Sequence, residues 1–242
     1  MKTRLIALVM VLVMGSGHTL HAGDKIAIQE GEKIIFLGDS ITASGAGRNG
    51  YCDLVIRGLN HLGLKVTWRG AGKGGHKSNN MLHRLQGDVI NQKPDWMTLS
   101  CGVNDVMQNA HGRGVDLPDY KKNITAIVDK AQAAGIKVMI LTATMIGENQ
   151  EEELNQNLIP YNDFLRKLAK EKACLLADLN ADHQAAVKAA QEKKPRIRHV
   201  LAHDGVHMWP SGNKMMARGV LRAFGVTEQQ LKSIEEEEWA KK

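Results

Sequence analysis

Aromatic residues are scarce in this chain of 242 residues, making up only 4% of the sequence. That scarcity argues against a wide aromatic platform on which bases or sugars could stack. Cysteine is also rare, with only Cys52, Cys101 and Cys174 present. Cys101 and Cys174 lie in apolar runs typical of buried thiols, whereas Cys52 is expected to be more exposed. None has a base motif beside it, so we expect neither a disulfide framework nor a catalytic cysteine.

A concentrated patch of one charge is missing as well. The net charge is +6, and a basic balance can indicate binding to nucleic acid. The basic residues are scattered, however, and the stretch Glu235–Glu238 is acidic, so we expect no nucleic-acid partner. The densest basic run, Lys193–Arg198, is expected to be a solvated loop, with contact to an acidic substrate as the alternative.

Only one long apolar run is present, and it lies at the N-terminus. Lys2 and Arg4 precede ten apolar residues at 5–14, a run too short to span a bilayer comfortably. This pattern predicts a secretory signal peptide at 1–22 and a secreted or periplasmic protein without stable membrane insertion, an uncleaved anchor being the alternative. The remainder, 24–242, has no repeat or linker and is expected to form one domain.

Strand and helix patterns alternate along that domain. Strands are expected at 33–37, 65–68, 96–100, 137–143 and 173–179. Helices are expected at 49–62, 79–85, 118–134, 151–172, 181–193, 211–224 and 227–240, with a kink or split at Pro160 and N-caps at Ser211 and Thr227. Such alternation predicts an α/β fold with three α/β/α layers around a five-stranded parallel sheet.

Four short motifs contain residues suited to ester cleavage, and the expected layout brings these motifs together. They are Gly38-Asp39-Ser40-Ile41-Thr42, Gly70-Ala71-Gly72, Gly102-Val103-Asn104-Asp105 and Asp204-Gly205-Val206-His207. The first three each follow a different expected strand, and the carboxyl ends of parallel strands share one edge of a sheet. The fourth lies in a loop before a late helix, which can return to that edge. The four motifs are therefore expected to meet.

The first and last motifs supply a nucleophile and its base. The Ser40 hydroxyl needs a neighbouring base, and His207 can accept its proton and later protonate the leaving alcohol. Asp204 can accept the other imidazole N–H and fix the tautomer. Asp39 and Asp105 are expected to brace their turns by hydrogen bonds rather than to react.

An oxyanion site is expected from three donors in the first three motifs. These are the backbone N–H groups of Ser40 and Gly72 and the side-chain amide of Asn104, which donates without adding charge. Glycine permits close approach of the substrate. Because the surrounding loop is rich in glycine, Gly74 is the alternative to Gly72.

The sequence offers two other kinds of site, a metal site and a phosphate-binding loop, and neither is expected. His199, His203 and His207 recur every four residues, which on a helix would align three imidazoles as metal ligands. Gly205 and Pro195 argue against a helix there, so no metal site is expected. The glycine loop lacks the Gly-Lys-Ser/Thr of a phosphate-binding loop. The chemistry requires no cofactor.

The motif set resembles the SGNH-hydrolase superfamily, also called GDSL esterases and lipases. The matching residues are Gly38, Asp39 and Ser40, then Gly72, then Gly102, Asn104 and Asp105, then Asp204 and His207. One departure is Gly70, where the commonest family pattern has an asparagine. The Gly-x-Ser-x-Gly elbow of α/β-hydrolases is absent. The resemblance implies a flavodoxin-like sheet and a serine esterase acting through an acyl-enzyme.

The expected function is an exported serine esterase that hydrolyses short-acyl esters, chiefly acetyl esters of carbohydrates, with a small molecule or an oligosaccharide as the ester substrate. The export signal, the lack of a long apolar lid and the polar loop 108–116 favour that substrate. A lysophospholipase or thioesterase is the alternative; Met107, Met145 and Met208 would then line an acyl groove, although we expect them to pack in the core. A non-catalytic binding module on this fold and a flavodoxin-like nucleotide binder remain further alternatives.

Overall fold

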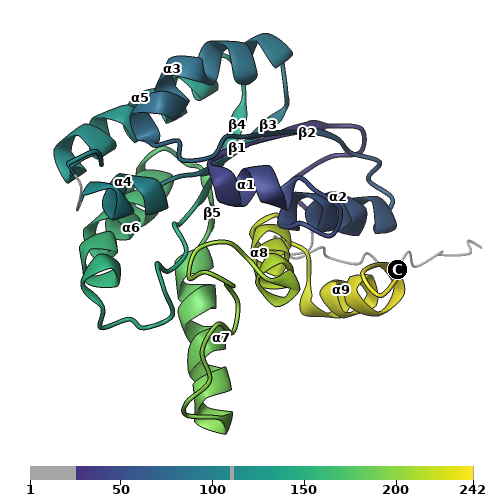
Figure 1. Cartoon of the computed structure of the whole chain (residues 1–242). Helices are drawn as coiled ribbons and strands as arrows, with labels where there is room; N and C mark the ends of the chain where they lie inside the picture. Colours follow the sequence, from purple (N-terminus) through teal and green to yellow (C-terminus); the bar gives the residue numbers. More distant parts are fainter. Residues whose placement is uncertain (1–25, 110–111, 242) are drawn as a thin grey trace, which may run out of the picture.

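A parallel sheet of five strands forms the centre of the protein in the computed structural model, which describes residues 26–109 and 112–241. The strands are β1 (Lys33–Gly38), β2 (Thr67–Gly72), β3 (Trp96–Ser100), β4 (Lys137–Leu141) and β5 (Leu175–Ala177). Their order is β2-β1-β3-β4-β5 (Figure 1). This confirms the expected flavodoxin-like fold, with the reversal of strand order between β1 and β3. The expected signal peptide at 1–22 lies outside the described residues.

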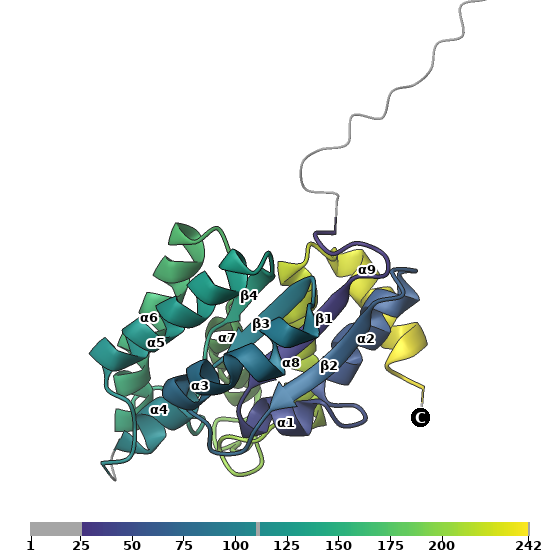
Figure 2. The ribbon, with the colours of Figure 1, turned by 90° about the horizontal axis from the view of Figure 1, so that it is seen from above.

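Helices cover both faces of the sheet. The helix α5 packs against α3 and α6, and α8 packs against α2 and α7, with the sheet between the two groups (Figures 1 and 2). The bounds are α1 (Ser40–Gly45), α2 (Tyr51–His61), α3 (Ser78–Asp88), α4 (Val103–Met107), α5 (Leu117–Ala133), α6 (Glu153–Glu171), α7 (Leu179–Lys193), α8 (Pro210–Ala223) and α9 (Glu228–Ser233). A 3-10 turn, Ile90–Gln92, follows α3.

The central strands are buried on both faces, which explains their unbroken apolar sequences. Every residue of β3 is buried, and so is every residue of β1 after Lys33. The edge strand β2 lies further along the chain than the expected 65–68, because the glycines of its motif pair with β1. Gly70 lies opposite Phe36 and Gly72 opposite Gly38, so part of the expected loop is strand.

Of the expectations about helices, one is wrong and one is confirmed. At Pro160, where a kink or a split was expected, α6 is not split; the proline lies on the exposed face, where water can satisfy the carbonyl that loses its helical partner. Ser211 is not an N-cap; α8 begins at Pro210, whose ring presets the first helical residue. Thr227 is the N-cap of α9, with Gln230 completing a capping box.

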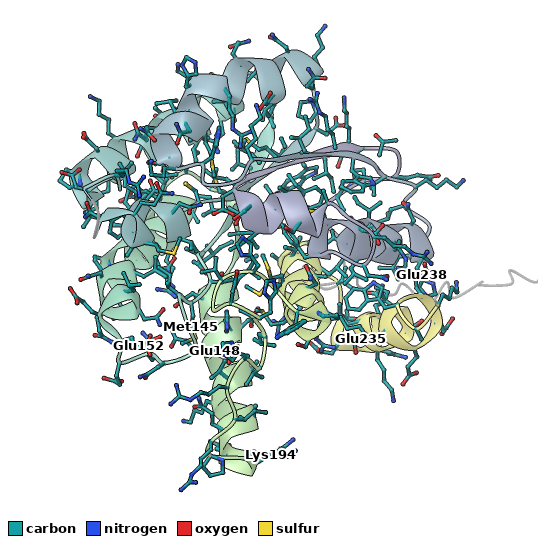
Figure 3. All side chains as sticks on the ribbon, viewed as in Figure 1. Met145, Glu148, Glu152, Lys194, Glu235 and Glu238 are labelled. Atoms are coloured by element: carbon teal, nitrogen blue, oxygen red, sulfur yellow. The ribbon has the colours of Figure 1, made fainter. Side chains whose placement is uncertain are left out.

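The C-terminal end folds back onto α2. A π-helical turn, Ile234–Glu238, follows α9. Glu238 pairs with Arg57 of α2, and Trp239 donates its indole N–H to the carbonyl of Leu54 at 3.0 Å. Figure 3 shows Glu235 and Glu238 on this last segment. The end of the chain thus closes the apolar face of α2 rather than lying free on the surface.

The thiols differ from expectation at two positions. Cys52 is fully buried on the inner face of α2, whereas the sequence suggested more exposure. Cys101 is buried as expected, but Cys174, just before the short edge strand β5, is only partly buried. All three are free thiols. Among the helices of the described residues, none combines the length and apolar character that crossing a membrane requires.

Candidate active site

A continuous chain of hydrogen bonds joins the first motif to the last. The Oγ of Ser40, the first residue of α1, lies 2.8 Å from Nε2 of His207. Nδ1 of the same imidazole lies 2.6 Å from Oδ2 of Asp204. The structure therefore brings together three expected residues across 167 positions of sequence. This geometry matches what proton transfer from a serine hydroxyl to an oriented histidine requires.

The environment of Asp204 keeps it ionised. Burial by itself would raise the pKa of this carboxyl, but hydrogen bonds from the ring of His207 and from the backbone N–H groups of His207 and Val206 outweigh it. The pKa of Asp204 is held well below its usual range. An ionised carboxylate can only accept, so Nδ1 of His207 must be the donor. Nε2 is then left to accept the Ser40 proton.

The buried amide of Asn104 lies beside the start of α1. Its Nδ2 is 3.2 Å from the carbonyl of His76 and 3.4 Å from Oδ2 of Asp39. Asp39 also caps α1 by accepting the N–H of Ile41 at 2.9 Å. Burial, with a smaller effect from the Asp105 charge, raises the pKa of Asp39 to about 6.

Gly72 is pressed against the first turn of α1. A Cβ at this position would lie 2.1 Å from the backbone nitrogen of Ala43, a distance that no side chain could occupy. A Cβ at Gly74, by contrast, would meet nothing within 4 Å. Gly72 is therefore the glycine whose backbone lies next to the helix that carries Ser40, and the local packing requires it to remain glycine.

The segment after Gly72 is held by contacts from α4. Asp105 accepts the N–H of Ser78 at 2.9 Å, and burial raises its pKa. Gln108 donates to the carbonyl of Gly75 at 3.1 Å. Together with the contact of Asn104 to His76, these bonds fix the glycine loop between β2 and α3.

Arg84 is a buried cation beneath the site that sequence analysis missed. From α3 its guanidinium donates to the carbonyls of Gly38 and Ala71, each at 2.7 Å, and it pairs with Asp88 at 2.8 Å. It thereby ties together the ends of β1 and β2, which lead into Ser40 and Gly72. The one hint in the sequence is that Arg84 falls on the apolar side of the helix expected at 79–85.

A second missed residue, Glu148, holds the loop that carries Asp204 and His207. Its carboxylate accepts the backbone N–H groups of Val200, Leu201 and Ala202 at 2.6, 2.7 and 3.1 Å. Figure 3 shows Met145 and Glu148 beside this part of the structure. We call residues 200–209 the base loop.

The base loop has a defined shape of its own. Ala202 and Met208 form an isolated antiparallel bridge, and the N–H of His203 donates to the carbonyl of His207 at 3.0 Å. Gly147 donates to the carbonyl of Gly205 at 2.7 Å. The loop is thus a small hairpin, anchored from the segment that follows β4, rather than a mobile connection.

The basic run and the three methionines named in the sequence analysis take different positions around this region. Arg196 and Arg198 of the basic run border a hollow of about 780 Å³ that reaches Asp204 and is also lined by the acidic residues Glu151 and Glu152. Of the three methionines, Met145 is buried, whereas Met107 and Met208 are partly buried against the core. Core packing, as expected, is their role.

The fold and this geometry together define an ester hydrolase of the α/β/α type with a serine beside an imidazole. The sequence from 36 to 215 matches the model of the GDSL-like Lipase/Acylhydrolase family. The chain therefore belongs to that family, and it is a carboxylic ester hydrolase.

Several related proteins have names that describe their activity. An acetylxylan esterase of Geobacillus stearothermophilus is 28% identical over 221 residues, which cover 82% of this chain and 96% of the relative. The solved structure of the acetyl xylan esterase AlAXEase is 36% identical, with a TM-score of 0.73, covering 79% of this chain and 98% of its own. A lipoprotein of Bacillus subtilis, YqeF, is 26% identical over 184 residues, 65% of this chain and 75% of the relative.

Solved structures of the Geobacillus stearothermophilus esterase, Axe2, are similar over 83% of this chain, with a TM-score of 0.73 and 26% identity. They include variants described as catalytic mutants, in which a serine, an aspartate or a histidine is replaced by alanine. In that protein the replaced aspartate and histidine are three positions apart.

Proposed function

We propose that this ester hydrolase uses Ser40 as its nucleophile, His207 as its general base and Asp204 as the group that orients the base. The observation that carries the proposal is the hydrogen-bond chain from Ser40 Oγ through His207 to Asp204, at 2.8 and 2.6 Å. Axe2 supports it, because its catalytic aspartate and histidine have the spacing of Asp204 and His207.

Acylation follows from this geometry. His207 Nε2 accepts the hydroxyl proton while Ser40 Oγ forms a bond to the acyl carbon, and the carbonyl electrons move onto oxygen. That oxyanion is bound by the N–H groups of Ser40 and Gly72 and by the amide of Asn104. Collapse of the tetrahedral intermediate breaks the ester bond, and His207 gives its proton to the departing alcohol.

Deacylation repeats the sequence with water. His207 takes a proton from a water molecule, which attacks the acyl group on Ser40. The second tetrahedral intermediate then collapses, the bond from the acyl carbon to Ser40 Oγ breaks, and Oγ takes the proton back from His207 as the acid leaves. Asp204 remains ionised throughout and stabilises the imidazolium in both halves. All the groups that the reaction uses belong to this chain.

We propose acetylated carbohydrate as the substrate. Two relatives are described as acetylxylan esterases, which supports a sugar hydroxyl as the leaving group. The side chains of Asp204 and His207 are 44% and 34% exposed, so the site is open enough for a polymer to reach it. Polar groups rather than an apolar tunnel line the hollow beside Asp204, which favours a short acyl group.

We also propose that the protein is exported, with 1–22 as its signal peptide. The support is the sequence of that segment and the description of the relative YqeF as a lipoprotein. The mass of the protein recovered from periplasm or medium tests this, since removal of the segment leaves a chain that begins near residue 23.

Hydrolysis rates test the catalytic proposal. We expect nitrophenyl acetate to be cleaved faster than the butyrate or octanoate, and acetate to be released from acetylated xylo-oligosaccharides. Ser40→Ala should lower kcat by about 10⁴-fold or more, the scale of losing a serine nucleophile. Ser44→Ala, an exposed serine on the same helix, is the matched control and should retain the activity.

Three outcomes would contradict parts of the proposal. Unchanged activity of Ser40→Ala would remove it as the nucleophile. A preference for octanoate would favour the lysophospholipase or thioesterase alternative. Failure of a fluorophosphonate probe to label Ser40, together with no hydrolysis, would indicate a binding module.

A further inference from the structure

Two imidazoles and a carboxylate gather at the tip of the base loop. Asp204 Oδ2 lies 2.6 Å from Nδ1 of His207 and 3.9 Å from Nδ1 of His203. One ligand atom from each of the three side chains lies within 4.8 Å of the others. Imidazole nitrogens and a carboxylate oxygen are ligands that Zn²⁺ prefers. His203 has no part in the ester-cleaving machinery described above.

These three side chains are accessible to a solvated ion. The side chains of His203 and Asp204 are 43% and 44% exposed, and that of His207 is 34% exposed. The rings of His203 and His207 are stacked, with centroids 5.9 Å apart and planes inclined by 20°. Trp209 packs edge-on against His203 at 5.2 Å. A metal ion therefore needs no opening of the fold to arrive.

The backbone supports this cluster independently of its side chains. The bond from the N–H of His203 to the carbonyl of His207 and the Ala202–Met208 bridge place both imidazoles on one hairpin. Glu148 fixes the residues that precede them. This part of the described chain contains no helix that could align the histidines in a row. The hairpin instead brings His203 and His207 next to each other.

We propose that His203, Asp204 and His207 form an inhibitory site for Zn²⁺ or a similar borderline transition metal. Zinc–ligand bonds of about 2.0–2.2 Å place tetrahedral ligand atoms about 3.3 Å apart. For zinc to bind, the distance from Asp204 Oδ2 to His207 Nδ1 must lengthen from 2.6 Å, and the distance from Asp204 Oδ2 to His203 Nδ1 must shorten from 3.9 Å. Each change is about half an ångström or slightly more. The ion binds the lone pair that Nδ1 of His207 exposes when the proton of the neutral ring moves from Nδ1 to Nε2.

Inhibition follows because the ion occupies the groups that make the histidine a base. With the metal on Nδ1, the proton of the neutral imidazole lies on Nε2, which then has no lone pair to accept a second proton, and the carboxylate that would stabilise the protonated ring is bound to the ion instead. His207 then cannot take the proton of Ser40. This consequence rests on the proposed function, whereas the metal site itself does not.

Titration of the intact protein with ZnCl2 tests the site without any substrate. After removal of metals by a chelator, calorimetry should detect one ion bound per chain. His203→Gln should bind at least about tenfold more weakly, an effect typical of disturbing a metal's surroundings. His199→Gln is the matched control, because this histidine belongs to the same segment but lies outside the cluster.

Activity provides the second readout. Rates on nitrophenyl acetate, each relative to the variant's own metal-free rate, should fall with ZnCl2 at the concentrations that saturate the calorimetric site, and excess chelator should restore them. His203→Gln should require at least about tenfold more ZnCl2, and His199→Gln should behave as the unaltered protein. Thermal melting without metal checks that each variant is folded, and Asp204→Asn repeats the binding test independently of His203.

The outcomes separate the two proposals. Equal zinc affinity in His203→Gln and the unaltered protein, or no binding at millimolar ZnCl2, would overturn the site. Binding without any loss of rate would overturn its inhibitory role. If no ester is hydrolysed at all, the proposed function fails, while the calorimetric comparison still decides on the metal site.

Discussion

The side chain of Asn104 already makes hydrogen bonds within the protein before any substrate binds. The amide of Asn104 is buried, and the two contacts of its Nδ2, at 3.2 Å to the carbonyl of His76 and 3.4 Å to Asp39, are long for N–H···O hydrogen bonds. A developing oxyanion is a better acceptor than the neutral carbonyl of His76, because hydrogen bonds to a charged acceptor are about twice as strong. In the proposed mechanism, Asn104 would therefore bind the transition state more tightly than the ground state.

Replacing Asn104 by alanine tests that role. We expect kcat on nitrophenyl acetate to fall by about 10²–10³-fold, the loss typical of one oxyanion donor, with a much smaller change in KM. The measurement is steady-state kinetics, accompanied by thermal melting because the residue is buried. An unchanged kcat, or a loss explained entirely by unfolding, would contradict the assignment.

Sequence motifs predicted which residues meet, because their order and the parallel sheet together fix one common edge. Ser40 and His207 are joined as expected although 167 positions separate them. Arg84 and Glu148 could not be found in this way. The contacts that tie them to the site are made to backbone atoms 46 and 52 positions away, and a backbone carbonyl or N–H leaves no trace in the sequence pattern.

At the scale of elements, the position of the base depends on a segment that contributes no reacting group. Residues 146–152, between β4 and α6, hold the base loop through the carboxylate of Glu148 and the backbone of Gly147. Three N–H groups that converge on one carboxylate give charge-assisted bonds, and losing such a bond costs about 1.5–3 kcal/mol. The geometry between His207 and Ser40 is thus set partly from outside the motifs.

Glu148→Gln should loosen the base loop while leaving the fold intact. One carboxylate oxygen becomes an amide NH2 that faces backbone donors, so we expect stability to fall by about 1–3 kcal/mol. Well below the melting temperature, kcat should still fall by about tenfold or more, because an ångström-scale displacement of the base is costly. Chemical denaturation and kinetics measure the two effects.

The neighbouring Glu152 provides the control for this prediction. It is the N-cap of α6 but makes no capping hydrogen bond with its side chain (Figure 3). Glu152→Gln should retain both stability and kcat. If Glu148→Gln also keeps its kcat, the carboxylate is a structural contact alone and does not position the base.

Element boundaries show where local patterns lose information. The expected second strand ended at Trp68, because glycines weaken strands in isolation. In the sheet, Gly70 and Gly72 pair with β1, since their lack of side chains lets α1 lie directly on the strand end. At Pro160 the helix continues because the proline is exposed to water. A tertiary contact overrode the local preference at the strand end, and solvent exposure did so at the proline.

At the scale of the whole molecule, one buried histidine links stability to pH. His183 of α7 is fully buried, and neither ring nitrogen has a hydrogen-bond partner. Burial lowers its pKa to about 4, with the Glu148 charge acting weakly in the opposite direction. In the unfolded chain a histidine has a pKa near 6.5. Between these two values the unfolded state binds a proton that the folded state does not.

Stability should therefore fall as the pH is lowered from about 6.5 towards 4, because proton binding favours the unfolded chain in that window. The difference of about 2.5 pKa units corresponds to about 3 kcal/mol at full effect. His183→Leu should remove this part of the pH dependence. Carboxyls with shifted pKa values, such as Asp39, are present in both proteins and largely cancel in the comparison.

Chemical denaturation at pH 7 and pH 4.5 measures this difference. We expect the free energy of unfolding of His183→Leu, relative to that of the unaltered protein, to be higher at pH 4.5 than at pH 7 by about 1–3 kcal/mol. His83→Leu, on the exposed side of α3, is the matched control and should follow the unaltered protein. A parallel shift of His183→Leu at both pH values would show that the imidazole takes up its proton in the folded protein as readily as in the unfolded chain. The acid sensitivity of the fold would then arise from its carboxyl groups.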